Sequence, residues 1–151
     1  MNVEHVLQAL RETLGLPDLE GRQLPINETV VALPPECVQA AAQTLVDRLE
    51  VTHLSTITGQ DKTTEIELLY HFWDGHGLTL RTSLPQECAR IATLIDLIPG
   101  AAYYEREIAE MLHVTFEGHP DPPALLLPDD WNGDPPLRRA SAPESDEEHP
   151  Q

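Results

Sequence analysis

Apolar residues recur every three or four positions at the start of the chain, which is the spacing of one face of an α-helix. Gly15 follows this run and can adopt the left-handed conformation that ends a helix. The pattern predicts a helix over residues 2–14 whose apolar face is formed by Val3, Val6, Leu7, Leu10 and Leu14. Residues 15–27 contain Gly, Pro and polar residues, and we predict no regular element there.

A buried strand and a second helix are predicted next. Residues 29–33 are β-branched and apolar, as in a buried strand, and Pro34 and Pro35 end the run. Residues 36–49 then repeat apolar side chains at helical spacing, with small residues that allow close packing on a sheet.

Three strands are predicted after this helix, over residues 51–59, 64–73 and 77–84. In the last two, apolar side chains alternate with their neighbours, as in a sheet with one face on a core. The turn at residues 74–77 makes these two strands an antiparallel hairpin.

The chain between this hairpin and a third helix is less regular. Residues 91–98 are apolar without a clear period, and their pattern leaves a strand and irregular structure equally open. Pro99 and Gly100 break the run. The third helix follows, with an apolar stripe formed by Ala101, Tyr104, Ile108, Met111 and Leu112.

Together these elements predict an α+β fold, with a mostly antiparallel or mixed sheet and helices packed on one face, over residues 1–117. Eight of the 14 prolines lie in residues 118–151, too densely for a helix or a central strand. We therefore predict an extended docking arm over residues 118–143 and a disordered acidic tail over residues 144–151.

Length and charge limit the function. The 151 residues match one domain, and the net charge of -17 repels nucleic acid and anionic lipid head groups. The N-terminus has no basic and apolar secretion signal, and no stretch is apolar for long enough to span a membrane. Cys37 and Cys88 lack a metal or redox spacing, and we interpret both as small buried apolar residues.

No standard catalytic motif is present, and we expect no flavin, metal or cluster. Glu107 and Glu110 could form a carboxylate pair for acid and base chemistry, or could be solvated or ion-paired charges. His113 and His119 match no zinc spacing. A freestanding enzyme that uses Glu107 and His119 is the alternative from a different functional class.

The arm contains more apolar side chains than an extended segment can bury against itself, namely Leu125, Leu126, Leu127, Trp131 and Leu137. They must pack on the parent domain or on a partner. We favour a partner, because a rigid Pro-rich arm loses little entropy on binding.

The segment from residue 105 to residue 139 resembles a known family. The run Glu105-Arg106-Glu107-Ile108-Ala109-Glu110-Met111-Leu112, followed by His119, Pro123 and Leu125-Leu126, is similar to the signature of the C subunit of respiratory complex I. The blocks Pro128-Asp129-Asp130-Trp131-Asn132-Gly133 and Pro136-Leu137-Arg138-Arg139 follow in the family's order.

This resemblance implies a subunit without a redox centre, in the hydrophilic arm of a proton-translocating NADH:quinone oxidoreductase. Its expected partners are the large quinone-site subunit and the terminal iron–sulfur subunit, on the cytoplasmic side of the plasma membrane. The membrane is then contacted only indirectly, through the complex. The equivalent subunit of a membrane-bound nickel–iron hydrogenase or another complex-I-like oxidoreductase is the alternative.

The residues expected to bind partners are Glu105, Arg106, Glu107, Glu110, His119, Asp121, Trp131, Arg138 and Arg139. The arginines among them are expected to meet acidic groups of a neighbouring subunit, and Trp131 to supply an apolar anchor. The chain departs from the family at residues 122–124, which lack the usual pair of cations, and at His113, where the family has a helix-ending glycine.

Overall fold

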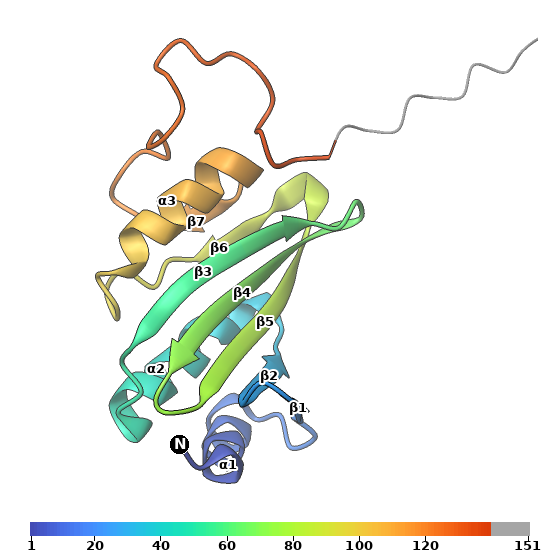
Figure 1. Ribbon diagram of the computed structural model, residues 1–151, viewed down its shortest axis with the longest axis vertical. Coiled ribbons are helices and arrows are strands. Elements are labelled where there is room, and N and C mark those ends of the chain that lie inside the picture. The colour runs from blue at the N-terminus through green and yellow to red at the C-terminus, as the bar shows by residue number, and fades with distance from the viewer. Residues whose placement is uncertain (140–151) are drawn as a thin grey trace, which may run out of the picture.

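Three helices and two β-sheets make up residues 1–139, the part of the chain that the computed structural model describes (Figure 1). The helices are α1 (Val3–Leu14), α2 (Val38–Leu49) and α3 (Ala101–Leu112). The strands are β1 (Gly21–Leu24), β2 (Glu28–Ala32), β3 (Leu54–Asp61), β4 (Glu65–Trp73), β5 (Gly77–Pro85), β6 (Arg90–Ala92) and β7 (Thr115–Glu117). Two short 3-10 helices, η1 (Pro35–Cys37) and η2 (Gln86–Cys88), complete the elements.

The main sheet has the strand order β1-β2-β5-β4-β3. The predicted hairpin is confirmed as β4 and β5, which pair antiparallel with Tyr70 opposite Leu80. β2 lies beside β5 and runs parallel to it, which makes the sheet mixed. β6 and β7 form a separate parallel pair.

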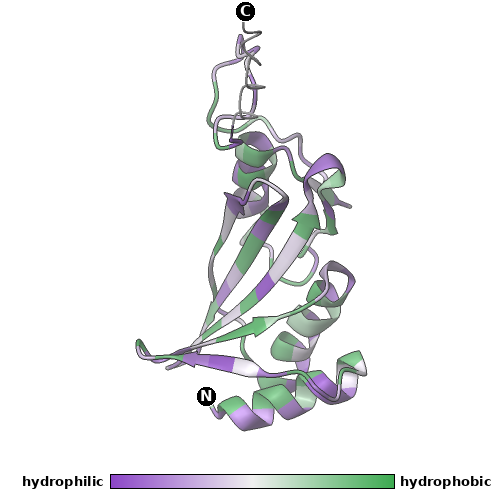
Figure 2. Ribbon diagram, turned by 90° about the vertical axis from the view of Figure 1, so that its right-hand side faces the viewer, coloured by the Kyte–Doolittle hydropathy of each residue, from purple (hydrophilic) through white to green (hydrophobic). Residues whose placement is uncertain are grey.

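One face of the main sheet is buried under the helices. Alternate residues of β4 point into the core, and Ile66, Leu68 and Tyr70 have no exposed surface. The same cluster contains Leu10 of α1, Ala41 and Leu45 of α2, and Ile108 and Leu112 of α3. Phe72 is buried on the same face, and the remaining residues of β4 are partly or fully exposed. The α+β fold with helices on one face is therefore confirmed, and Figure 2 shows the apolar segments of the strands and helices.

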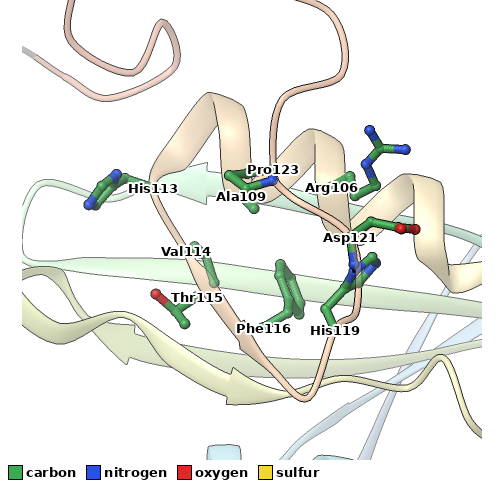
Figure 3. A pocket seen from close by; sticks show the side chains of 9 residues that line it. All are labelled: Arg106, Ala109, His113, Val114, Thr115, Phe116, His119, Asp121 and Pro123. Carbon is green, nitrogen blue, oxygen red and sulfur yellow. Dashed lines mark hydrogen bonds between the residues drawn. The ribbon is translucent and has the colours of Figure 1, made fainter.

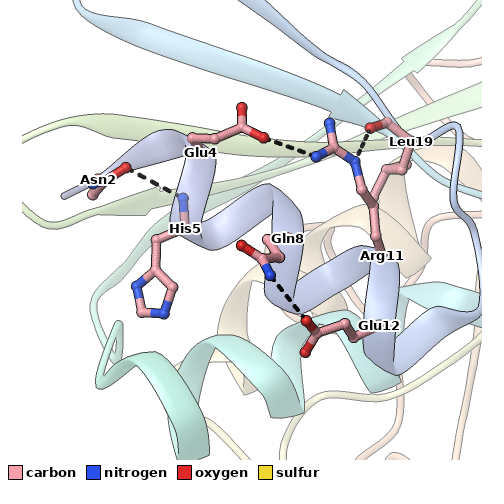
Figure 4. A network of polar contacts seen from close by, with 7 residues as sticks. All are labelled: Asn2, Glu4, His5, Gln8, Arg11, Glu12 and Leu19. Atoms are coloured by element: carbon pink, nitrogen blue, oxygen red, sulfur yellow. Dashed lines mark hydrogen bonds and ion pairs between the residues drawn. The ribbon is translucent and has the colours of Figure 1, made fainter.

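α1 begins and ends as the sequence predicts. The side chain of Asn2 accepts the backbone N–H of His5 at 3.2 Å, and Gly15 ends the helix with a φ of 64°. Arg11 then fixes the chain that leaves the helix, because its Nε donates to the carbonyl of Leu19 at 2.8 Å (Figure 4). Its other side-chain contact is an ion pair with Glu4 at 2.9 Å.

α3 packs closely on β3, the edge strand, and Gly59 makes this approach possible. A Cβ at this position would lie 2.5 Å from Cδ1 of Leu112 and 3.3 Å from Cδ2 of Leu68. The glycine therefore sets how near α3 lies to the sheet, and with it the position of everything that α3 carries.

Several sequence predictions differ from the structure. β1 lies within residues 15–27, where no element was expected, and β7 was also missed. Of residues 91–98, only the first two are in a strand, and the rest is irregular.

The interpretation of both cysteines as buried residues was wrong. Cys37 is half-buried and Cys88 is exposed, because each ends a short 3-10 helix that follows a surface proline. Neither cysteine is in a disulfide within the described residues.

The arm leaves the domain at the end opposite α1 (Figure 1). Its last residues, 140–143, and the predicted tail at 144–151 lie outside the described residues. No helix within residues 1–139 is both long enough and apolar enough to cross a membrane.

Candidate docking surface

α3 has one buried side and one side that faces the arm. Its buried residues are Ala101, Glu105, Ile108 and Leu112. Arg106 and Glu110, one helical turn apart, lie on the side that contacts the arm. The amphipathic pattern of the helix therefore places these two charged side chains where the arm passes.

Arg106 and Glu110 form the first attachment site of the arm. The guanidinium of Arg106 donates to the carbonyl oxygens of Pro122 at 3.1 Å and Ala124 at 2.7 Å. The carboxylate of Glu110 accepts the consecutive backbone N–H groups of residues 125, 126 and 127 at 3.1, 2.8 and 3.0 Å. The two side chains thus satisfy both kinds of backbone group in a segment that has no strand partner.

The ionised form of Glu110 is favoured by this arrangement. Partial desolvation raises its pKa, but the three backbone N–H donors and the positive charge of Arg106 outweigh that effect. The pKa of Glu110 therefore lies below its ordinary value. A carboxylate, rather than a carboxylic acid, holds the arm.

Asp61, at the end of β3, forms the second attachment site. One carboxylate oxygen accepts the backbone N–H of Arg139 at 2.9 Å, and the other accepts that of Thr63 at 2.7 Å. Arg138 adds hydrogen bonds from its guanidinium to the carbonyl oxygens of Leu112 at 2.6 Å and Gln86 at 3.2 Å. Desolvation raises the pKa of Asp61, but these donors and the charge of Arg138 lower it below its ordinary value.

Between the two attachment sites the chain forms a loop, residues 128–136, that we call the arch. A turn closed by a 2.9 Å hydrogen bond from the N–H of Trp131 to the carbonyl of Pro128 begins it. The side chain of Trp131 is 48% exposed, and its ring packs on Gly133. A hollow of about 490 Å³ separates the arch from α3 and is lined by residues of both.

A smaller hollow, about 210 Å³, lies beside the start of the arm (Figure 3). Phe116 and Val114 line it together with Arg106 and His119. Nδ1 of His119 accepts the backbone N–H of Asp121 at 3.1 Å, so Nε2 carries the proton that bonds to the carbonyl of Ala102 at 3.1 Å. His119 therefore bridges α3 and the arm.

Within residues 1–139, no three His, Cys, Asp or Glu side chains gather in a way that could hold a metal ion. The surface formed by α3 and the arm consists of polar side chains that bond to backbone groups and of exposed apolar side chains.

Comparison with known proteins identifies the family. A sequence model described as the respiratory-chain NADH dehydrogenase 30 Kd subunit matches residues 31–147, most of the chain. The chain belongs to this family. The C subunit of the NADH-quinone oxidoreductase of Roseiflexus castenholzii is 32% identical over 130 residues, which cover 80% of this chain and 75% of the relative.

Two further relatives of this member of the 30 Kd subunit family have informative names. The C/D subunit of the NADH-quinone oxidoreductase of Gluconacetobacter diazotrophicus is 41% identical over 61 residues, which cover 40% of this chain and 10% of that protein. A chain in the structure of the membrane-bound sulfane sulfur reductase, an archaeal respiratory membrane complex, superposes with a TM-score of 0.71 and 25% identity. That match covers 86% of this chain and 79% of the other.

In this member of the 30 Kd subunit family, Glu105 does not belong to the surface. It has no exposed area; its carboxylate accepts the backbone N–H of Leu94 at 2.7 Å and the hydroxyl of Thr93. Burial raises its pKa, and these hydrogen bonds and His119 only partly offset the effect. Glu105 fixes the chain before α3, and the docking surface proposed below excludes it.

The structure separates the candidate catalytic residues. Glu107 is exposed and lines a hollow between α3 and β3, whereas His119 lines the hollow on the arm side. Glu110 uses its carboxylate to bind the arm and makes no hydrogen bond to Glu107. The geometry gives no support to acid and base chemistry by these groups.

Sequence reasoning missed Asp61. It contacts the arm through the backbone N–H of Arg139, a group that every residue except proline has. Its only signal was a carboxylate at a strand end just before a turn. The arginines were predicted as partner-binding residues, but Arg106 and Arg138 donate to carbonyl oxygens of their own chain.

Proposed function

We propose that the chain is a non-redox structural subunit in the hydrophilic arm of a proton-translocating NADH:quinone oxidoreductase. The supporting observation is the arm, which is attached to the domain at two sites and leaves Trp131 and Leu126 exposed. Large exposed apolar side chains on an ordered segment are typical of a surface that a partner covers. In this proposal the chain binds no flavin, metal or cluster and carries no electrons.

The proposed partners are the large quinone-site subunit and the terminal iron–sulfur subunit. One relative bears the double name C/D, and a single chain that contains two subunits keeps them together. This fusion supports a position of the present chain beside the subunit that corresponds to the D part of that relative. The complex would keep the chain on the cytoplasmic side of the membrane, with only indirect membrane contact.

The proposed docking residues have two roles. Arg106, Glu110, His119 and Arg138 hold the arm in position through the hydrogen bonds described above. The remaining residues have exposed surface that can touch a neighbour, and these are Glu107, Asp121, Trp131 and Arg139.

A second candidate is the equivalent subunit of another complex-I-like oxidoreductase, such as a membrane-bound nickel–iron hydrogenase. The likeness to a chain of the archaeal sulfane sulfur reductase favours it. The two candidates differ in the neighbours of the chain and not in its fold.

Affinity purification from the native organism tests both candidates. The chain carries an N-terminal tag, membranes are solubilised in mild detergent, and captured subunits are identified by mass spectrometry. Capture of a quinone-site subunit, an iron–sulfur subunit and NADH-binding subunits supports the first proposal. Capture of a nickel-ligating large subunit supports the second. Recovery of the chain alone, from membranes whose respiratory complexes survive solubilisation, contradicts both.

The proposed absence of a cofactor is tested on the chain purified natively and separated from its partners. We expect a visible spectrum without flavin or cluster absorption and no stoichiometric iron or zinc. A stoichiometric redox group in the isolated chain would rule out the structural role.

A further inference from the structure

The arch is acidic, and the described part of the chain leaves its charges unpaired. Asp129, Asp130 and Asp134 are all exposed. None of them takes part in an ion pair among residues 1–139. The sequence contains no Lys or Arg between Arg106 and Arg138, so the arch has no cation of its own.

The two arginines that border this region are used elsewhere. Arg106 donates to two carbonyl oxygens of the arm, and Arg138 donates to two carbonyl oxygens of the domain. Two nitrogen atoms of each guanidinium are therefore bonded to backbone oxygens, and the arch itself offers a neighbour carboxylates and an aromatic ring.

Trp131 lies between Asp130 and Asp134 in the sequence, and its position is fixed by local contacts. Gly133 packs against its ring, where an added Cβ would lie 3.2 Å from Cζ2. The turn hydrogen bond to Pro128 fixes its backbone. The ring also lines the hollow of about 490 Å³ between the arch and α3, which is large enough to admit side chains of another protein.

An exposed indole with carboxylates nearby in the sequence is suited to bind a cationic side chain. A guanidinium or ammonium group can lie on the face of a Trp ring and bond to carboxylates at the same time. A second copy of this chain is disfavoured, because each copy carries a net charge of -17.

Building on the proposed function, we propose that the arch receives a basic segment of a neighbouring subunit. A Lys or Arg side chain of that segment lies on the ring of Trp131, and the carboxylates of Asp129, Asp130 and Asp134 surround it. This reverses the expectation from the sequence, in which the arginines of this chain meet acidic groups of the partner.

Charge removal in the assembled complex tests the proposal. The tagged full chain carries Asp129→Asn, Asp130→Asn and Asp134→Asn together. Its control carries Asp18→Asn, Glu20→Gln and Glu50→Gln, which remove three exposed carboxylates from the part of the chain that precedes β3. Retention of neighbouring subunits is measured as the salt concentration of the wash is raised.

We expect the arch variant to lose neighbours at low salt, with retention reduced roughly tenfold and a weaker dependence on salt than the wild type. The control should behave like the wild type. Equal retention by the arch variant and the wild type, or an equal loss in the control, overturns the proposal. If the wild type itself captures no neighbour, the proposed function fails first.

Photo-cross-linking identifies the occupant without removing any charge. A photoreactive residue replaces Asn132, which lies next to Trp131, and the captured peptide is sequenced by mass spectrometry. A peptide of another subunit with an excess of Lys and Arg supports the proposal. An acidic or uncharged peptide, or a peptide of this same chain from a second copy, overturns it.

Discussion

Arg106 and Glu110, one turn apart on α3, bind opposite groups of the same backbone segment. Between Pro122 and Leu127, the guanidinium of Arg106 donates to backbone carbonyl oxygens, and the carboxylate of Glu110 accepts backbone N–H groups. The segment has no β-sheet partner in this part of the structure. Two side chains of a helix therefore provide the backbone hydrogen-bond partners that a neighbouring strand provides in a sheet.

Glu110→Gln should release this segment. The variant keeps one acceptor oxygen and loses the charge, so three charge-assisted hydrogen bonds are weakened. Hydrogen exchange of the amides of Leu125, Leu126 and Leu127 should accelerate by about 5- to 30-fold, as expected for a loss of one or two kcal/mol. Glu107→Gln, on the same helix, is the matched control, and equal exchange in both variants would contradict the assignment.

Acid should have the same effect as this substitution. The pKa of Glu110 is lower in the folded protein than in the unfolded chain, so its contribution to stability is present above the ordinary glutamate pKa. That contribution is lost as the pH falls through the folded-state value. Amide exchange at residues 125–127, corrected for its intrinsic pH dependence, should therefore accelerate in the acid range.

Glu105→Gln should change the pH dependence in the opposite direction. Burial raises the pKa of Glu105 in the folded state, so ionisation costs folding energy as the pH rises above the ordinary value of 4.5. The variant cannot ionise, and its amide can still accept from Leu94. Its stability relative to the wild type should rise with pH in urea denaturation series. A difference that stays constant across the series would refute the role of burial.

Gly59→Ala should push α3 away from β3. The new methyl group meets the buried side chain of Leu112, and overpacking of this kind costs about 1–3 kcal/mol. The free energy of unfolding by urea measures it. Gly100→Ala is the control, because a Cβ at that position meets no atom within 4 Å. Equal stability of the two variants would mean that α3 does not rest on this glycine.

His113→Gly should stabilise the protein. His113 ends α3 with a φ of 57°, in the left-handed region that disfavours residues with a Cβ. Relief of this strain outweighs the greater entropy of glycine in the unfolded chain, and we expect a gain of about 0.5–1 kcal/mol. Thermal unfolding measures the change, with His5→Gly inside α1 as a control that should destabilise.

The sequence predicted best where one face of an element is buried. β4 alternates between core and surface, β5 keeps the alternation in its second half, and their hairpin was found almost to the residue. β1 was missed because none of its four residues is fully buried, so no apolar alternation marks it. Parallel pairing of β2 with β5 could not be derived, since side-chain periodicity carries no information about which strands are neighbours.

The candidate surface was predicted by residue type but not by role. The resemblance pointed to Arg106, Glu110 and Arg138, yet their contacts are made with backbone groups, which leave no pattern in the sequence. Glu105 was expected to bind a partner, whereas it is buried against Thr93 and Leu94. A charged residue on a helix is exposed by default, and only the packing of α3 reveals the exception.

The parallel pairing of β2 with β5 also governs the order of folding. Glu28 lies opposite Gly77. During synthesis, β2 therefore leaves the ribosome well before β5, its partner in the sheet, has been made. β3, β4 and β5 can meet through short connections, and we expect them to form first. The first strands to be synthesised are then among the last to join the sheet, and until they do, the edge of β5 stays open to other chains.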